Sequence, residues 1–270
     1  MSEEMSVEVV PGARLRVQRF GPSTAAPVLF IHAFPLSGEM WRECVRFLAG
    51  SVQAIVPDLR GLGQSVTPGA MLVGTSMSTH ASDMAGVLAA CGVPRVIVCG
   101  SSMGGMIAME MSRLYPQRVA GLILCDTRAT PETDEGKVTR ESRATLAETQ
   151  GANAVAELMI GNVLAKSASP ALRAEVLAMM NASDVAGVAA ASRALASRPD
   201  ARPHLASVKV PVLAVCGAED AGTTPDDMRA MAAGIPGAKF EVIAGAGHLP
   251  PLERPEAFAK VVGAWLAGVG

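Results

Sequence analysis

Short apolar runs alternate with segments of helical periodicity along most of this chain of 270 residues. Such alternation favours repeated strand–helix–strand units, which form a parallel sheet with helices on its faces. Several runs are almost continuous in Val, Ile and Leu, as is typical of strands buried on both sides. We therefore predict an α/β fold whose strands include 27–32, 52–57, 95–100, 121–126, 210–217 and 239–243, after an antiparallel pair at 7–10 and 13–20.

Three further segments have small and apolar residues at helical spacing. They predict helices over 79–92, with Ser78 or Thr79 as the N-cap, over 103–115, and over 255–266.

The segment 128–207 interrupts the alternation, because it contains no convincing strand and is rich in Ala and Arg. An insertion of helices at one loop of a sheet is how a lid or cap is built. We expect a helical cap over 128–207 between two parts of one core domain, 1–127 and 208–270. The cap helices are predicted near 138–150, 152–165, 171–181 and 184–197.

Charge and hydropathy exclude several classes of function. The formal net charge is -2, and no Lys/Arg cluster is long enough to suggest a nucleic-acid partner. No run of about 18 apolar residues predicts a membrane span, and the acidic start, MSEEMSVEVV, is not typical of a signal peptide. The five cysteines form no C-x-x-C pair. We therefore expect buried, reduced thiols, no metal site and a cytoplasmic protein.

A G-x-S-x-G pattern at 100–104 places Ser102 between a predicted strand and a predicted helix. The pattern alone is weak evidence for a nucleophile. Its position between a predicted strand and a predicted helix strengthens that evidence, because a nucleophilic serine in this motif lies in a strand–turn–helix segment. The glycines permit a sharp turn, which strains the serine backbone and lifts its hydroxyl clear of the sheet. The helix N-terminus also favours developing negative charge. We predict that Ser102 is a nucleophile, whereas Ser101 lies outside the two-glycine frame.

A serine nucleophile needs a base, and His248 is the best placed of the four histidines. It lies in the loop after the last predicted strand, where it can reach the carboxyl edge of the sheet. His80 is expected to be exposed at a helix start, and His204 to be structural. Asp220 is predicted to orient His248 without taking the proton itself, and Glu219 is the alternative acid.

The tetrahedral intermediate of acyl transfer carries a negative oxygen, which preorganised backbone N–H groups must meet. We expect one donor to be the N–H of Met103, directly after the nucleophile. The second should be the N–H of Phe34, in the loop after the strand 27–32. His32 is expected to hold this loop in place, and the Phe34–Pro35 bond is a candidate cis peptide.

Five segments in this order resemble the α/β-hydrolase superfamily, and the resemblance covers nearly the whole chain. It implies an eight-stranded, mostly parallel sheet flanked by helices, a helical cap over the site, and no metal or organic cofactor. Ala33 departs from the family's usual glycine, so its methyl group could shift the oxyanion loop. The segments are His32-Ala33-Phe34-Pro35, Asp58-Leu59-Arg60-Gly61-Leu62-Gly63-Gln64-Ser65, the Ser102 motif, 217–220 and Gly247-His248.

Within the superfamily, Ser102 separates this chain from branches that use Asp or Cys as the nucleophile. The stretch after Ser102 and the four-helix cap look like small bacterial carboxylesterases and 3-oxoadipate enol-lactonases. This resemblance implies hydrolysis of a carboxylic ester or lactone through an acyl-enzyme. Acyl transfer, perhydrolysis or C–C bond hydrolysis by the same residues is the alternative. A catalytically inactive binding protein with the same fold is a third hypothesis.

A pocket for a small-molecule ester or lactone is expected to be lined by apolar side chains. These residues could instead pack only between the cap and the core. An arginine such as Arg128, Arg140 or Arg143 could hold a substrate carboxylate, although arginines on helices are usually solvated. No oligomeric state is predicted. The candidate lining residues are Phe34, Trp41, Leu158, Met159, Met179 and Met180.

Overall fold

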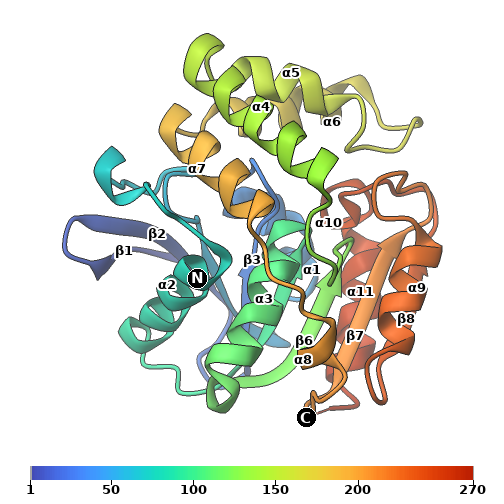
Figure 1. Cartoon of the computed structure of the whole chain (residues 1–270). Helices are drawn as coiled ribbons and strands as arrows, with labels where there is room; N and C mark the ends of the chain where they lie inside the picture. The colour runs from blue at the N-terminus through green and yellow to red at the C-terminus, as the bar shows by residue number, and fades with distance from the viewer. Residues whose placement is uncertain (1, 270) are drawn as a thin grey trace.

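The computed structural model of the chain describes residues 2–269 and shows one eight-stranded sheet (Figure 1). The strand order is β1-β2-β4-β3-β5-β6-β7-β8. β2 pairs antiparallel with β1 and β4, whereas the other pairs are parallel, which confirms the predicted fold class. The strands are β1 (Ser2–Val10), β2 (Ala13–Phe20), β3 (Ala26–Ile31), β4 (Val52–Pro57), β5 (Val96–Ser101), β6 (Val119–Cys125), β7 (Val212–Gly217) and β8 (Lys239–Ile243).

The largest difference in strand bounds is at β1, which begins well before residue 7. Its first half has no apolar run that would reveal a strand. Charge pairs across the two strands support its pairing with β2 instead: Arg16 lies 2.8 Å from Glu4, and Arg19 lies 3.3 Å from Glu3.

Helices cover both faces of the sheet, so alternate strand residues enter two hydrophobic cores. On β6, Leu122 and Leu124 face the core under α2 and α3, whereas Ile123 and Cys125 face the core under α1 and α11. Outside the segment between β6 and β7, the helices are α1 (Arg42–Phe47), α2 (Met77–Ala90), α3 (Met103–Leu114), α9 (Pro225–Ala233), α10 (Pro250–Glu253) and α11 (Pro255–Leu266), with 3-10 turns η1 (Gly38–Trp41), η2 (Gly69–Met71) and η3 (Pro116–Arg118).

The start of α2 differs from the prediction. Ser76, not Ser78 or Thr79, is the N-cap, because its hydroxyl accepts the Thr79 N–H at 3.2 Å while the Thr79 hydroxyl accepts the Ser76 N–H at 3.2 Å. The helix therefore starts earlier, and His80 lies in its interior with no exposed surface. The expectation of an exposed His80 is wrong.

Between β6 and β7 the chain forms five helices, and we call this segment, residues 126–211, the insertion. Four of these helices match predicted ones and lie together at the top of Figure 1, while the short α8 is additional. A Cβ on Gly187 would overlap the Gly61 carbonyl oxygen, so α7 and the loop after β4 touch through their backbones. The helices are α4 (Asp134–Gln150), α5 (Ala152–Ile160), α6 (Pro170–Asn181), α7 (Val185–Ala196) and α8 (Arg202–Leu205).

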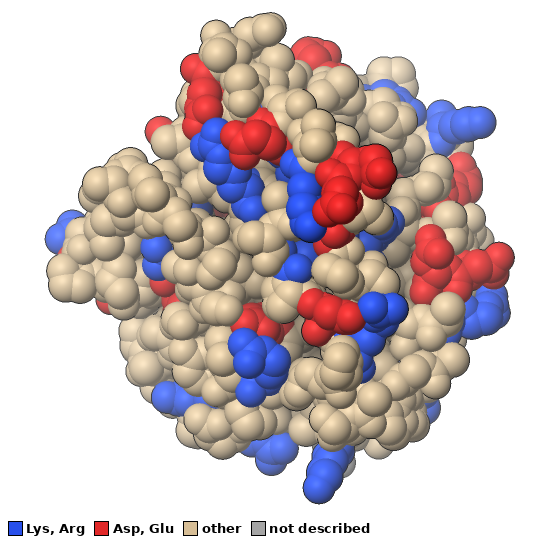
Figure 2. Space-filling view, in the orientation of Figure 1, with Lys and Arg blue, Asp and Glu red and all other residues tan. Residues whose placement is uncertain are grey.

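Acidic and basic side chains are interspersed on the viewed surface rather than separated by sign (Figure 2). For example, Arg193 on α7 pairs with both Glu141 and Glu148 on α4. Within residues 2–269, none of the helices combines the length and the apolar character needed to cross a bilayer. All five cysteines are free thiols, of which four are buried and Cys91 is partly exposed.

Candidate active site

Ser102 lies in the turn between β5 and α3, with a left-handed backbone conformation of φ 52° and ψ −112°. This turn depends on the glycines of its motif. A Cβ on Gly104 would overlap the carbonyl oxygen of Ile31, and one on Gly100 would overlap that of Gly104. Because no side chain fits at these positions, the strained turn requires Gly on both sides of the serine.

Hydrogen bonds from the end of β6 hold this strained turn in place. The Ser102 N–H donates to the carbonyl oxygen of Cys125 at 2.8 Å. The Thr127 hydroxyl donates to the carbonyl oxygen of Ser102 at 2.7 Å. Both backbone polar groups of the serine are therefore fixed, and its side chain is left to face the loop after β8.

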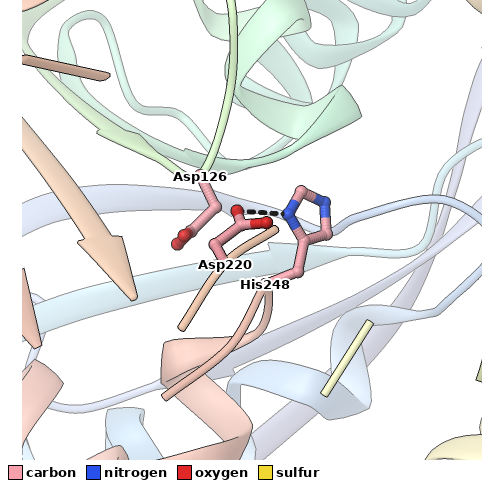
Figure 3. A group of neighbouring side chains, drawn as sticks. All are labelled: Asp126, Asp220 and His248. Atoms are coloured by element: carbon pink, nitrogen blue, oxygen red, sulfur yellow. Dashed lines mark hydrogen bonds and ion pairs between the residues drawn. The ribbon is translucent and has the colours of Figure 1, made fainter. Parts of the chain in front are cut away.

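His248 brings the loop after β8 to Ser102. Its Nε2 lies 2.9 Å from the Ser102 Oγ. Its Nδ1 lies 2.7 Å from Asp220 Oδ2 (Figure 3). A carboxylate oxygen can only accept a hydrogen bond, so Nδ1 carries the proton and Nε2 is free to accept one from the serine. The predicted residues Ser102, His248 and Asp220 are thus brought together in one hydrogen-bonded chain.

Asp220 is held by the loop after β7. Its Oδ1 accepts the N–H groups of Gly222 at 2.8 Å and Thr223 at 3.0 Å, while its other oxygen faces His248. Burial by itself raises the pKa of this carboxyl, but the bonds from His248 and the two N–H groups outweigh burial and hold the pKa below its usual value. Asp220 is therefore an anion beside the imidazole. Glu219, the alternative acid, has an exposed side chain.

Asp126, a second carboxyl beside His248, is a site residue that sequence reasoning missed (Figure 3). It is fully buried directly after β6, with φ 42°, and its Oδ1 accepts the Gly217 N–H at 2.8 Å. Burial and then the charge of Asp220 raise its pKa well above the usual value, which favours its protonated form. The sequence signal that could have identified Asp126 is its position directly after β6, which lies between β5 and β7 in the sheet. The carboxyl ends of adjacent parallel strands meet at one edge of the sheet.

The side chains of Asp126, Asp220 and His248 place potential ligand atoms within 4.8 Å of one another, a spacing that could suit a metal ion. Their polar atoms already have other partners. Both ring nitrogens of His248 are engaged, Asp220 accepts three hydrogen bonds, and both oxygens of Asp126 have donors nearby. A cation would have to displace this network, so the arrangement fits proton transfer better than metal binding.

Glu253 is a second residue that sequence reasoning missed. Its Oε1 accepts the N–H groups of Gly247 at 2.9 Å and Leu249 at 3.1 Å, on either side of His248. Its Oε2 accepts the N–H of Ala165 in the insertion at 2.7 Å. One buried carboxylate thus fixes the His248 loop and ties it to the insertion. No sequence pattern used above marks this residue.

The loop after β3 lies where a negative oxygen on the reacting carbonyl could be met. His32 Nε2 accepts the Leu59 N–H at 2.9 Å, so its Nδ1 carries the proton and donates to the Ala33 carbonyl at 2.9 Å. This agrees with the expected structural role of His32. The Phe34–Pro35 peptide is cis, as expected. Met103 begins α3, so its N–H is one of the first-turn donors that a helix leaves unpaired.

A cavity of about 200 Å³ opens on the Ser102 and His248 side chains. Of the residues predicted to line it, Phe34, Leu158 and Met159 do so. Cationic side chains share the lining with these apolar ones. The charged and polar residues are Asp126, Arg128, Glu132, Arg140, Arg143, Asn162 and Thr223.

Three predicted pocket residues lie elsewhere. Trp41 is fully buried, with its ring centroid 5.2 Å from that of Phe30 and 5.9 Å from that of Phe258, because the aromatic residues gather in the core under α1 and α11. Met179 and Met180 lie on α6 and pack in that same core cluster. Their placement corrects the expectation that they line the cavity: helical side chains at these positions point into the packing between helices.

Comparison with known proteins agrees with this geometry. Residues 26–255 match the family model described as alpha/beta hydrolase fold. The 3-oxoadipate enol-lactonase 1 of Acinetobacter baylyi is 28% identical over 277 residues, with 100% of both chains covered.

Among solved structures, a thermophilic esterase from Thermogutta terrifontis, with malate bound, is 36% identical and has a TM-score of 0.92, with 100% of this chain and 99% of that chain covered. The enol-lactonase from Burkholderia xenovorans LB400 is 26% identical and has a TM-score of 0.87, with 97% and 99% covered. This chain therefore belongs to the alpha/beta hydrolase fold family.

Proposed function

We propose that this protein hydrolyses carboxylic esters or lactones through an acyl-enzyme on Ser102. The observation that carries the proposal is the hydrogen-bonded chain from Ser102 Oγ through His248 to Asp220, at 2.9 and 2.7 Å. We further propose that residues 128–207 act as a cap over a core made of 1–127 and 208–270, since the cavity over Ser102 is lined from both parts.

In the proposed mechanism the Ser102 oxygen attacks the carbonyl carbon while His248 Nε2 takes the hydroxyl proton. The N–H groups of Phe34 and Met103 meet the oxygen that becomes negative. When the ester bond breaks, His248 returns the proton to the leaving alcohol, which stays on the same molecule if the substrate is a lactone. Water then attacks the acyl-enzyme with His248 again as the base, and Asp220 stabilises the imidazolium in both steps.

The size of the cavity and the named relatives both favour small esters or lactones as substrates. A cavity of about 200 Å³ admits a short acyl chain rather than a long one. The relatives are described as enol-lactonases and an esterase, and the esterase that is 36% identical was solved with malate bound.

The test is hydrolysis of 4-nitrophenyl acetate, butyrate and octanoate by the wild type, Ser102→Ala and Ser101→Ala. The wild type should cleave the short esters and Ser102→Ala should lose turnover. Ser101→Ala is the matched control, because Ser101 is buried with no hydrogen-bond partner for its hydroxyl among the described residues. Its removal should leave both folding and turnover within a few-fold of the wild type.

Covalent labelling by a fluorophosphonate gives an independent readout. Mass spectrometry should place the adduct on Ser102 in the wild type and in Ser101→Ala. Ester turnover that survives in Ser102→Ala would refute the proposed nucleophile, and a wild type that neither turns over an ester or lactone nor takes the label would refute the proposed function.

A further inference from the structure

The wall of the cavity that the insertion forms is strongly basic. Arg128, Arg140 and Arg143 line it, and they come from the first residues of the insertion and from α4. Apolar side chains, Leu158 and Met159 from α5, share the lining with them. A molecule whose carbonyl lies at Ser102 would therefore meet apolar surface and positive charge in the same cavity.

The acidic side chains in this lining do not neutralise the positive charge. Glu132 already binds Arg198, at 2.6 and 3.1 Å, and also Arg140, at 3.1 Å. It is thus one anion shared between two cations. Asp126 is the other acid of the lining, and burial and the charge of Asp220 raise its pKa, which favours its uncharged form. Even two acids would leave the three arginines of the lining in excess. Arg128 is engaged by the Gly222 carbonyl oxygen, which carries no charge.

The third arginine of this lining is Arg143. Its Nε is buried and has no hydrogen-bond acceptor among the described residues. A buried donor without an acceptor costs free energy, and a guanidinium stays protonated and offers five N–H donors in a planar fork that matches a carboxylate. Burial lowers the pKa of Arg143, and burial together with the charge of Arg143 lowers that of Arg140. An anion in the cavity would relieve both costs.

We propose that Arg143, with Arg140 beside it, binds a carboxylate of the substrate, so that the preferred substrates are small esters or lactones bearing a second, free carboxylate. This inference rests on the proposed function for the hydrolytic step, because it assigns the substrate class of the same site. Arg143 is then a specificity-determining residue: it contacts the substrate away from the bond that breaks. The size of the cavity limits the spacer between the two groups to a few carbon atoms.

The test compares monomethyl glutarate with methyl 4-carbamoylbutanoate, which has the same shape but a neutral amide in place of the carboxylate. Hydrolysis is followed by proton release at constant pH. The wild type should cleave the anionic ester with a kcat/KM at least tenfold higher. Arg143→Gln should lower that kcat/KM at least tenfold, mainly through KM, and change the value for the amide less than about threefold.

Lys137→Gln is the matched control, because it removes one positive charge from the same helix at an exposed position paired with Asp134. It should leave both kcat/KM values unchanged. An equal loss on both esters in Arg143→Gln, or a wild type with no preference for the anion, would overturn the inference while the hydrolase proposal stands.

Binding of glutarate to Ser102→Ala, measured by titration calorimetry, separates the two proposals. The Ser102→Ala protein should bind glutarate, and the double variant with Arg143→Gln should bind it at least tenfold more weakly. If no ester or lactone is hydrolysed but glutarate binding depends on Arg143, the anion site is supported and the hydrolase proposal fails. Equal binding to the two proteins would overturn the anion site.

Discussion

Replacing Asp220 by Asn should reverse the tautomer of His248. The backbone N–H groups of Gly222 and Thr223 both point at Oδ1 of Asp220, at 2.8 and 3.0 Å. An amide must turn its oxygen toward these two donors, since its NH₂ group cannot accept their bonds. The NH₂ then faces His248 Nδ1 as a donor. The imidazole would carry its proton on Nε2, toward Ser102, and could no longer accept the serine proton.

The expected loss is about 10⁴-fold in kcat, as for a triad held in the wrong tautomer. This corresponds to about 5 kcal/mol of transition-state stabilisation, because each factor of ten is about 1.4 kcal/mol. The assay is the steady-state hydrolysis of 4-nitrophenyl butyrate at neutral pH, with circular dichroism to confirm that the variant is folded.

Asp126→Asn is the matched control for this variant. Asp126 is the other buried carboxyl beside His248, but its pKa is raised well above the usual value, which favours the neutral acid that an amide mimics. The amide oxygen can still accept the Gly217 N–H. Asp126→Asn should therefore keep kcat within about tenfold of the wild type. Comparable losses in both variants, or an Asp220→Asn protein with more than about a tenth of wild-type kcat, would refute the tautomer argument.

Two stability measurements follow from the same packing. Trp41→Ala should lower the free energy of unfolding in urea by about 3–5 kcal/mol, because it empties a fully buried site between Phe30 and Phe258. The KM for short esters should stay unchanged, and a raised KM would indicate that Trp41 does line the cavity. Burial, followed by the charges of Arg60 and His32, lowers the pKa of His80 to about 3. Between pH 6.5 and 3 the unfolded chain therefore binds a proton that the folded chain does not. The free energy of unfolding should decrease by about 1.4 kcal/mol for each unit by which the pH is lowered in this range. Between pH 7 and 5 the wild type should thus lose about 2 kcal/mol more than His80→Leu, and equal losses would contradict this.

The sequence predicted the elements that depend on neighbours along the chain. Strands buried on both faces were visible as continuous Val, Ile and Leu runs, and the glycines around Ser102 were visible because only they permit the turn. Two boundaries were predicted wrongly for different reasons. The N-cap of α2 is Ser76, since a reciprocal pair of bonds with Thr79 at the same helix start was overlooked. Strand β1 begins earlier than predicted, because charge pairs with β2 rather than an apolar pattern support its first half.

The same distinction separates the site residues. Ser102, Asp220 and His248 could be selected from the sequence because each follows a strand of one parallel sheet, and the carboxyl ends of such strands meet at one edge. Asp126 also follows a strand of this sheet, but its role, like that of Glu253, depends on which backbone N–H groups it meets across the fold. The cavity wall was the least predictable part. Helical periodicity indicates that a side chain is buried, but it does not show which other residues bury it.

The sequence by itself therefore determined the α/β fold, the strained serine turn and the three residues at the sheet edge, all of which follow from local chain geometry. Tertiary structure alone decided that Trp41 belongs to the core and that Arg143, in the cavity lining, has a buried Nε with no hydrogen-bond acceptor within residues 2–269. The physical reason is that burial and pairing are properties of contacts between distant segments, which form only when the chain folds.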